Sequence, residues 1–474
     1  MMHQGKKTIF LTVGTGVVAR NLLSNRFFEK LTEKYKVVIF TPLYNDPDFC
    51  RRFGGESVYF QKLEKRRLTR IELFFISLHK ALIYNESVKI KSFYSLSSSM
   101  RQERTLPKIL KNYTELIVFG LFLSKIPILR TILKALDRFI YTDEYYREVY
   151  AHYTPSLVFV TNMGADDEVY LLRSAIRRGI PNIGMAKSWD NFSKNGFREW
   201  VDKVVVWSEY MKDEVWQFQK YPKHDIAVVG IPQFDVLHDV ESTHTRLDFV
   251  KTYGLDPKKK IILFGQSNPY ICPDDAYVCG VLKDWIIKNG KPYQILIRPH
   301  FRHKNADKLF LDLVDNETVF IDLQNEGSNF ATGAWDLSME SQIRRAISLR
   351  FSDIVVNAAS TLLLDTAASE TPYISYAFDK DKNTPYGKSI KRIFDLLWYR
   401  DLRKHGFEEL LTPNEGELIQ RIENILTSPQ KKLPSFYGGL IERFCYKIDG
   451  KSGERLFGFI DSYIHEREKN TTKT

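Results

Sequence analysis

Short runs of β-branched and aromatic residues alternate along this chain with longer stretches of helical spacing. In the first half, stretches such as Glu168–Arg178 and Glu209–Lys220 separate these runs. Strands that alternate with helices predict a parallel sheet with helices packed on its faces. The predicted strands of this half are Lys7–Val13, Tyr35–Phe40, Ser156–Val160, Asn182–Met185, Lys203–Trp207 and Ile226–Val229.

The alternation stops at Gly230–Asp235 and starts again near residue 260. The strands predicted beyond this break are Lys260–Phe264, Tyr293–Ile297, Thr318–Ile321, Asp353–Val356 and Pro372–Tyr376. A length of 474 residues suits two or three domains. We therefore predict an α/β protein with two doubly wound, Rossmann-like domains, residues 1–235 and 259–474, joined by a linker at 236–258 and facing each other across a cleft. In such sheets, ligands bind outside the carboxyl ends of the strands.

One segment carries nearly all of the net charge of +11. Residues 61–140 hold 16 Lys and Arg against 6 Asp and Glu, whereas the rest of the chain holds 53 against 52. The segment includes the apolar stretch Leu116–Ser124, which is too short for a bilayer span of about 20 residues. Such a segment favours contact with an anionic membrane surface, and a buried helix with a solvated basic face is the alternative. No nucleic-acid-binding motif accompanies the charge, so nucleic acid is not expected as a partner.

The four cysteines and the N-terminal residues bear on the cellular compartment of the protein, and both favour the cytoplasm. The cysteines are scattered and show neither zinc-ribbon spacing nor the density of a disulfide framework. Residues 1–10 are polar and lead into the first predicted strand, which is unlike a signal peptide. We expect a cytoplasmic protein that associates peripherally with the inner face of the cell membrane.

Two motifs follow strands of the first predicted domain. Gly14, Thr15 and Gly16 come directly after the first strand, where small residues let the backbone approach a ligand. A plain tight turn is the alternative. Asp166 and Asp167 follow another strand and either bind a substrate hydroxyl or cap a helix.

The loop Lys187–Gly196 is the main candidate for chemistry in the first domain. Its central carboxylate, Asp190, can accept a proton from a substrate hydroxyl. Trp189, which we expect to be exposed at a strand end, can stack on a sugar ring, and Ser188 and Asn191 add hydrogen-bonding groups. The alternative is an Asx-turn in which Asp190 binds backbone N–H groups.

Strand ends of the second predicted domain carry groups suited to anions. The first strand is followed by small and amide side chains, namely Gly265, Gln266 and Ser267. Arg298, His300 and Arg302 follow the second strand, and arginine binds phosphate with two parallel hydrogen bonds. His300 and His303 have no third ligand nearby in the sequence, so a metal is not expected.

A third strand end of this domain opens a helix. Asn357, Ser360 and Thr361 lie where backbone N–H groups and hydroxyls can hold a pyrophosphate without a metal. Asp365, one turn further, can reach a ribose hydroxyl. The alternative is an N-cap followed by a solvated Asp. Asp379-Lys-Asp381 has the Asp-x-Asp spacing of metal-dependent transferases, but its late position in an α/β domain disfavours a metal site.

Several stretches in a fixed order carry a family resemblance: Val205–Glu209, Val229–Asp235, Arg298–His300, Ser352–Asp365, Thr371–Tyr376 and Asp449–Gly453. They resemble the GT-B superfamily, in particular the branch of CDP-glycerol glycerophosphotransferases and related surface-polysaccharide transferases. The resemblance covers about residues 155–460 and leaves 60–150 without a counterpart.

The resemblance implies a nucleotide-activated donor on the second domain and an acceptor on the first. By analogy, Arg298, His300, Ser360 and Thr361 hold the donor phosphates and Asp365 the ribose, while the motifs of the first domain bind the acceptor. Glycerophosphotransferases usually carry a Trp-His-Gly type loop where this chain has Trp189-Asp190-Asn191. Asp in the place of the candidate catalytic His favours sugar transfer over transfer of glycerol phosphate.

We therefore predict an inverting glycosyltransferase that moves a sugar from a nucleotide sugar to a surface-polysaccharide or lipid-linked acceptor, without a metal or other cofactor. Asp190 is the predicted base, and His300 with Arg298 is predicted to stabilise the leaving nucleotide. Three alternatives are a glycerol- or ribitol-phosphate transferase, a nucleotide-sugar 2-epimerase of the same fold, and a non-catalytic scaffold of a polysaccharide assembly complex.

Overall fold

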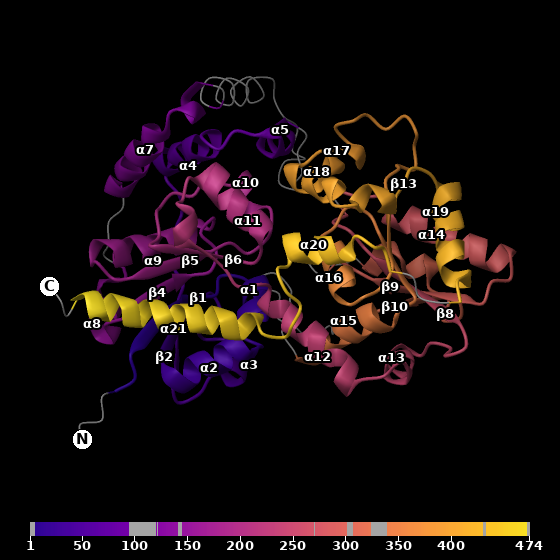
Figure 1. The fold of residues 1–474 in the computed structure, drawn as a ribbon, viewed down its shortest axis with the longest axis horizontal. Helices are drawn as coiled ribbons and strands as arrows, with labels where there is room; N and C mark the ends of the chain where they lie inside the picture. Colours follow the sequence, from indigo (N-terminus) through magenta and orange to yellow (C-terminus); the bar gives the residue numbers. More distant parts are fainter. Residues whose placement is uncertain are drawn as a thin grey trace. The chain divides into compact units, whose positions relative to one another are not determined.

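A computed structural model describes residues 5–93, 120, 122–140, 145–269, 271–300, 307–323, 339–429 and 433–471. These residues form two compact units (Figure 1). The first unit holds the described residues up to Lys89 and from 120 to Gln233, together with those from Lys451 onward. The second holds Phe234–Gly450 and the described residues 90–93. Arg302, His303 and residues 94–119 of the basic segment lie outside the described ranges.

The first unit is built on a seven-stranded sheet in the order β3-β2-β1-β4-β5-β6-β7, in which every neighbouring pair is parallel. Its strands are β1 (Thr8–Thr12), β2 (Lys36–Thr41), β3 (Val58–Lys62), β4 (Leu157–Val160), β5 (Asn182–Met185), β6 (Lys203–Val206) and β7 (Ile226–Val228). The chain runs outward from β1 to β3 and then returns to the other side of β1 with β4. The topological switch point, where ligands bind in doubly wound sheets, therefore lies between β1 and β4.

Helices cover this sheet and begin where the sequence supplies caps. Asn25 caps α2 and Ser208 caps α11 through their side-chain oxygens, and Thr69 and Glu72 form a capping box at α4. The helices of the unit are α1 (Gly16–Leu22), α2 (Arg26–Lys34), α3 (Pro47–Phe53), α4 (Arg70–Ala81), α7 (Pro127–Phe139), α8 (Arg147–Tyr153), α9 (Asp166–Arg177), α10 (Asn191–Lys194), α11 (Glu209–Glu214) and α21 (Ser452–Thr471). The helix α5 (Glu86–Phe93) begins in this unit and ends in the second.

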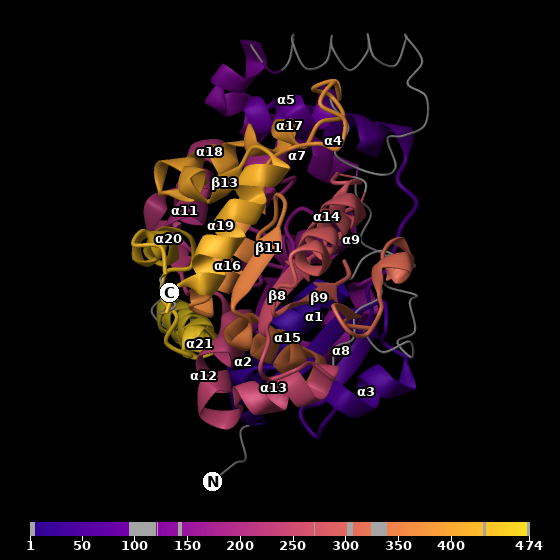
Figure 2. The same cartoon turned by 90° about the vertical axis from the view of Figure 1, so that its right-hand side faces the viewer.

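The second unit repeats the same winding in a six-stranded parallel sheet with the order β10-β9-β8-β11-β12-β13 (Figure 2). Its strands are β8 (Lys260–Gly265), β9 (Tyr293–Arg298), β10 (Val319–Ile321), β11 (Ile354–Asn357), β12 (Tyr373–Tyr376) and β13 (Leu411–Thr412), and the switch point lies between β8 and β11. Its helices are α12 (Asp235–Thr243), α13 (Arg246–Tyr253), α14 (Asp275–Lys288), α15 (Met339–Phe351), α16 (Leu362–Ala368), α17 (Lys391–Phe394), α18 (Leu397–Lys404), α19 (Glu415–Thr427) and α20 (Tyr437–Phe444). The prediction of an α/β protein with two Rossmann-like sheets is confirmed.

The segment 236–258, expected as a linker, instead forms most of α12 and all of α13, which pack on α15 within the second unit. A capping box of Thr245 and Asp248 starts α13, and its Phe249 is fully buried. The sequence of this stretch is mainly polar, so its two helices were not predicted; they are stabilised by packing on α15.

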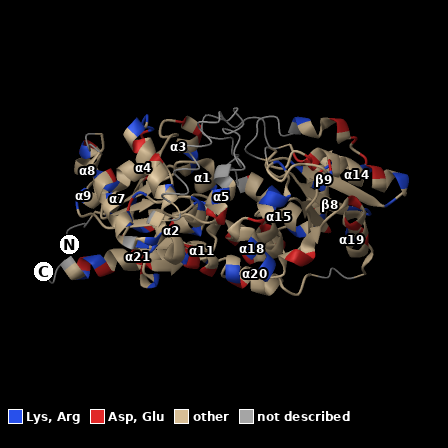
Figure 3. Cartoon of the chain, turned by 90° about the horizontal axis from the view of Figure 1, so that it is seen from above, with Lys and Arg blue, Asp and Glu red and all other residues tan. Residues whose placement is uncertain are grey.

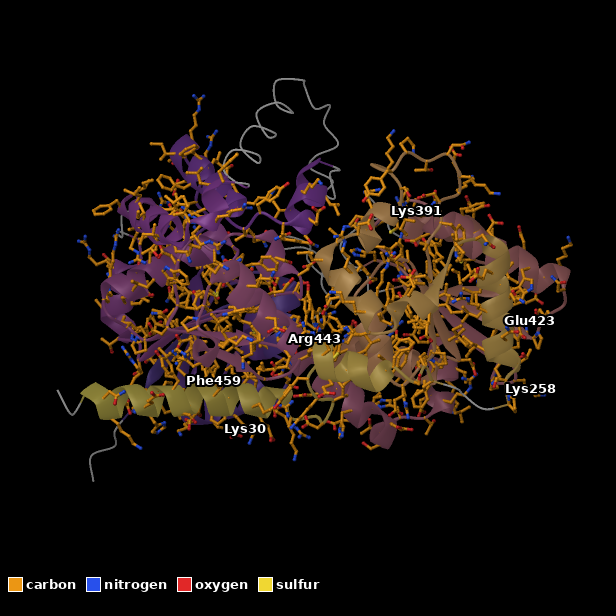
Figure 4. The ribbon with its side chains drawn as sticks, turned by 45° about the horizontal axis from the view of Figure 1, so that its top comes forward. Lys30, Lys258, Lys391, Glu423, Arg443 and Phe459 are labelled. Atoms are coloured by element: carbon orange, nitrogen blue, oxygen red, sulfur yellow. The ribbon has the colours of Figure 1, made fainter. Side chains whose placement is uncertain are left out.

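The C-terminal helix α21 also departs from the expected boundary, because it packs beside α2 of the first unit (Figure 1). Asp461 on α21 accepts a 2.6 Å hydrogen bond from the Tyr35 hydroxyl and pairs with Lys34. Lys30, labelled in Figure 4, lies 3.9 Å from Glu454 on the same helix. Basic and acidic residues both occur along α21 (Figure 3), and its buried apolar side chains include Leu456 and Ile460.

Candidate functional site

In the first unit, the switch point brings together Gly14, which follows β1, and Glu168, which follows β4. Glu168 was not among the predicted site residues. Its Oε2 accepts hydrogen bonds from the Thr12 hydroxyl at 2.5 Å and from the Asn162 N–H at 2.9 Å. A Cβ atom added to Gly14 would lie 3.1 Å from Glu168 Oε1. Gly14 therefore leaves room for this carboxyl group, which is only 1% exposed.

Two buried oxygens at this switch point have no hydrogen-bond partner among the described residues, namely Glu168 Oε1 and Thr15 Oγ1. Burial raises the pKa of Glu168 to about 7, although the hydrogen bond from Thr12 and the charge of Lys187 act in the opposite direction. Buried polar atoms without partners are uncommon in folded proteins, and a ligand or ion that completes the site is one explanation for them.

The predicted acceptor residues Asp166 and Asp167 occupy the first turn of α9. Ala165, rather than either Asp, stands at the N-cap of this helix. Asp166 forms a 2.9 Å ion pair with Arg198, and burial raises the pKa of Asp167. The N-cap alternative is therefore wrong, and the acceptor contact of both residues stays a prediction.

The loop after β5 holds Asp190 in a network of its own. Asp190 Oδ2 pairs with Lys194, and Oδ1 accepts a 3.2 Å hydrogen bond from the Asn191 amide. The expectation that Trp189 is exposed is wrong. Its side chain is 4% exposed and packs edge-on against Trp207, with ring centroids 4.8 Å apart. The physical reason is that removing a large aromatic surface from water stabilises the folded protein. Ser188 lies at the start of the turn, and its carbonyl accepts the Asn191 N–H.

A second buried carboxyl group lies beside this loop. Glu214 accepts a 2.6 Å hydrogen bond from the Tyr210 hydroxyl through Oε1, whereas its Oε2 has no partner among the described residues. Burial raises the pKa of Glu214 to about 8, and the negative charge of Asp190 adds to this increase. At neutral pH the Glu214 carboxyl group beside the Asp190 loop is therefore predominantly protonated.

In the second unit, the groups after β8, β9 and β11 meet at the switch point. The Asn357 amide donates to the Gly265 carbonyl and, at 3.1 Å, to Ser267 Oγ. Gln266 Oε1 accepts a 2.7 Å hydrogen bond from the His300 N–H. Five of the predicted donor residues are thus linked by hydrogen bonds that involve backbone or side-chain groups of the consecutive residues 265–267.

Arg298 ends β9 and bonds to Asp322 at 3.2 Å and to Ser348. Arg344 also bonds to Asp322, at 2.7 Å, so that two arginines share one carboxylate and the cluster keeps a positive charge. Arg298 Nη1 and Gln266 Nε2 are buried donors without a partner among the described residues. Unpartnered donors beside excess positive charge are suited to bind a phosphate oxygen.

The third predicted donor motif surrounds the start of α16. Ser360 Oγ accepts the Leu362 N–H at 3.2 Å, and Thr361 is the N-cap residue without a side-chain cap bond. Asp365 pairs with Arg345, so the alternative of a solvated Asp is wrong and its predicted contact with a ribose hydroxyl remains untested. Arg302 lies outside the described residues. Across the described ranges, no group of three or more His, Cys, Asp or Glu side chains is arranged to hold a metal ion.

The sequence profile of one family, "CDP-Glycerol:Poly(glycerophosphate) glycerophosphotransferase", matches residues 162–462. The chain belongs to this glycerophosphotransferase family. The match includes Glu168, the Asp190 loop and all of the predicted donor residues, and it begins after Gly14 and the basic segment. The resemblance inferred from the sequence is confirmed.

A curated relative of this glycerophosphotransferase-family chain is the teichoic acid poly(glycerol phosphate) polymerase of Bacillus subtilis (strain 168). The two are 25% identical over 285 residues, which make up 58% of this chain and 32% of the relative. The chain therefore matches about a third of the length of that relative.

Solved structures of similar fold include UDP-N-acetylglucosamine 2-epimerases. The putative epimerase of Listeria monocytogenes has a TM-score of 0.54 and 12% identity, with 98% of each chain covered. The epimerase of Methanocaldococcus jannaschii has a TM-score of 0.52 and 13% identity, with 96% of this chain and 99% of that chain covered. At this identity, the likeness shows the GT-B fold alone.

Proposed function

We propose that this chain transfers an alditol phosphate, such as glycerol phosphate, from a CDP-activated donor to a hydroxyl group of a cell-envelope polymer. The family match over residues 162–462 carries this proposal, because it spans both the Asp190 loop and the donor network. The name of the Bacillus subtilis relative supports poly(glycerol phosphate) as the class of acceptor. This proposal puts the phosphotransferase alternative ahead of sugar transfer.

The donor diphosphate would lie against the two unpartnered donors, Arg298 Nη1 and Gln266 Nε2, with the Ser360–Thr361 turn beside them. Charge on the leaving nucleoside phosphate would then be stabilised by fixed N–H groups and by the excess charge of the Arg298–Arg344–Asp322 cluster. Arg298 is positioned in advance by Asp322 and Ser348, which reduces the reorganisation needed on binding.

A nucleotide sugar is the second candidate donor. Asp190 occupies the position at which the Trp-His-Gly type loop of glycerophosphotransferases has its His. A carboxylate base is suited to deprotonate an acceptor hydroxyl that attacks an anomeric carbon. The two candidates share the acceptor hydroxyl and differ in the donor atom that is attacked.

Thermal unfolding of the protein with CDP-glycerol, CDP-ribitol, CMP, UDP and UDP-sugars tests the donor. A ligand at 100 times its Kd adds about 2.7 kcal/mol of stability, which raises the Tm of a unit of this size by roughly 5–10 °C. Gln266→Glu should abolish this increase because it adds a negative charge beside the phosphates. Arg350→Lys, a change at a basic residue that pairs with Glu241 and Glu370 instead, is the matched control.

The pattern of ligands decides between the candidates. An increase with CDP-glycerol or CDP-ribitol supports the phosphotransferase, and an increase with a UDP-sugar alone would favour sugar transfer. No increase with any nucleotide would overturn both and leave the scaffold alternative. Each variant is compared with its own unliganded Tm, so that a general loss of stability is not mistaken for lost binding.

We also propose that the first unit docks on a membrane surface, but through apolar side chains rather than through charge. On α7, the basic and acidic side chains point inward: Lys134 donates to the Glu199 carbonyl at 3.2 Å, Arg138 pairs with Glu199, and Asp137 pairs with Arg198 at 2.8 Å. These charges are neutralised within the fold and are not available to attract anionic lipids.

The outward face of α7 is apolar instead. Ile128, Ile132, Leu136 and Phe139 lie on this helix and are 47–87% exposed. The neighbouring helix α4, seen beside α7 in Figures 1 and 2, also exposes apolar side chains, namely Ile71, Leu73 and Phe74. Its Glu72 and His79 are buried, and Arg70 at its start is exposed. A helix with its apolar face turned outward is unfavourable in water and favourable at the headgroup boundary of a bilayer. Within the described part of the chain, no helix is long and apolar enough to cross a membrane.

Co-sedimentation with vesicles of anionic and of zwitterionic lipid tests this surface. Ile132→Asp with Phe139→Asp should abolish binding and leave the Tm unchanged, because both side chains are exposed. Leu247→Asp, at an exposed apolar residue of α13, is the matched control. Binding that survives high salt supports apolar insertion, whereas binding that is lost in high salt and unaffected by the α7 substitutions would refute it.

A further inference from the structure

Among the predicted and observed carboxyl groups of the first unit, Glu168 combines three features. It lies at the switch point between β1 and β4, its Oε1 is buried without a partner among the described residues, and a glycine faces it. Ligands of doubly wound sheets bind at this point. A carboxyl oxygen that is kept from water and left without a partner suits a group that receives a substrate hydroxyl.

The surroundings fix the orientation of Glu168 and leave one oxygen for a substrate. Thr12 from β1 and the Asn162 N–H after β4 both bind Oε2. The Thr161 N–H binds Thr12 Oγ1 at 2.8 Å, so the partner of Glu168 is itself held in place. Thr15, directly after Gly14, adds a buried hydroxyl without a partner. A substrate hydroxyl that reaches Glu168 Oε1 would supply the partner that this oxygen lacks.

The protonation of Glu168 suits proton transfer at neutral pH. Burial raises its pKa to about 7, and Lys187 from the loop after β5 is the charged group that lowers it. The other carboxyl groups of the first turn of α9 are Asp166, which pairs with Arg198, and Asp167, which lies near Lys65 and Glu64. An acid with a pKa close to the working pH is an effective general base.

Asp190, the base predicted from the sequence, is engaged differently. One of its oxygens is in the ion pair with Lys194 and the other accepts the Asn191 amide. Both oxygens of Asp190 therefore have partners within its own loop, whereas Glu168 Oε1 has none among the described residues. The comparison favours Glu168.

We propose that Glu168 binds the attacking hydroxyl of the acceptor and takes its proton, which rests on the transferase function proposed above. In this step the acceptor oxygen forms a bond to the donor phosphorus that carries the alditol. The bond from that phosphorus to the bridging oxygen breaks, and CMP leaves with the electron pair. The hydroxyl proton ends on Glu168 Oε1, from which it returns to solvent after the product leaves.

Single-turnover rates of wild type, Glu168→Gln, Glu168→Asp and Asp190→Asn, measured with CDP-glycerol and a glycerol-phosphate oligomer, test the assignment. Glu168→Gln should lower the rate by roughly 10²–10⁴-fold and abolish the rise in rate as pH increases through about 7, which removal of a structural contact alone would not do. The Tm increase caused by the donor should be unchanged. Glu168→Asp should recover part of the rate, and Asp190→Asn should keep the pH profile.

A Glu168→Gln enzyme with the wild-type rate and pH profile would overturn the assignment while the transferase function stands. If wild type transfers neither an alditol phosphate nor a sugar, the proposed function fails instead. In that case, Tm measurements with the glycerol-phosphate oligomer alone test whether Glu168 binds the acceptor. A Tm increase with the oligomer that Glu168→Gln abolishes supports the acceptor site, and an equal increase in both proteins refutes it.

Discussion

The buried carboxyl group of Glu214 should make the stability of the first unit depend on pH, and Glu214→Gln should remove the contribution of this one group. The pKa of Glu214 is raised to about 8, mainly by burial, from an ordinary value near 4.5. Below about pH 4.5 the folded and unfolded states both carry the proton. Between that value and about pH 8, the unfolded chain releases the proton and the folded protein retains it, so stability falls as pH rises.

The magnitude follows from the two pKa values. Each pH unit in this window lowers the free energy of unfolding by about 1.4 kcal/mol, and the full difference is about 5 kcal/mol. Glutamine resembles the neutral form that predominates at pH 7 and keeps an oxygen for the Tyr210 hydroxyl. The variant should therefore match wild type near pH 5 and exceed it by about 3 kcal/mol near pH 7.

Scanning calorimetry of both proteins between pH 5 and pH 8 measures this difference. An excess of about 3 kcal/mol corresponds to a Tm that is roughly 6–12 °C higher in a unit of this size. Glu408→Gln, at an exposed residue that pairs with Arg403, is the control and should follow wild type. Parallel Tm curves for wild type and Glu214→Gln would refute the reasoning.

Two further predictions concern the packing of the first unit. Asp137→Asn should lower the free energy of unfolding by about 3–5 kcal/mol in a denaturant titration, because it leaves Arg173 and Arg198 buried without their shared carboxylate; unchanged stability would contradict this. Gly230→Ala should cost about 1–3 kcal/mol and speed proteolytic release of α21, since Gly230 has φ +86° and an added Cβ would lie 2.5 Å from Ser452 Oγ. Gly179→Ala is the control, because Gly179 also has a positive φ, of +64°, but has open space around it. Equal proteolysis of the two variants would show that the steric contact with Ser452 has no effect.

Much of the fold was predictable because parallel strands buried on both faces are uninterrupted apolar runs. β1, β4, β5 and β12 are of this kind, and each was predicted within two residues of its observed bounds. Two edge strands were missed. β3 is partly exposed and reads Val-Tyr-Phe-Gln-Lys, and β13 has only two residues. An edge strand buries less of its surface, so its sequence carries a weaker apolar signal.

The candidate sites were predictable to the level of the strand end. Turns at the carboxyl ends of strands are recognisable from small and polar residues, and Gly14, Gln266, Arg298 and Asn357 do lie at or directly after strand ends. Glu168 was overlooked because it is one of three consecutive acidic residues in a helix start. Only the packing of β1 against β4 distinguishes it from Asp166 and Asp167 by burying it.

The sequence by itself determined the two doubly wound sheets, the family and the strand ends that carry polar groups, because these depend on local patterns of apolar and turn-forming residues. Only the tertiary structure decided that Trp189 is buried, that Asp365 pairs with Arg345, that α21 packs on the first unit and that α7 turns its charges inward. The physical reason is that burial and pairing depend on partners far apart in the chain. The same carboxylate or arginine is a solvated surface group, a structural ion pair or a reactive group according to which distant residues surround it.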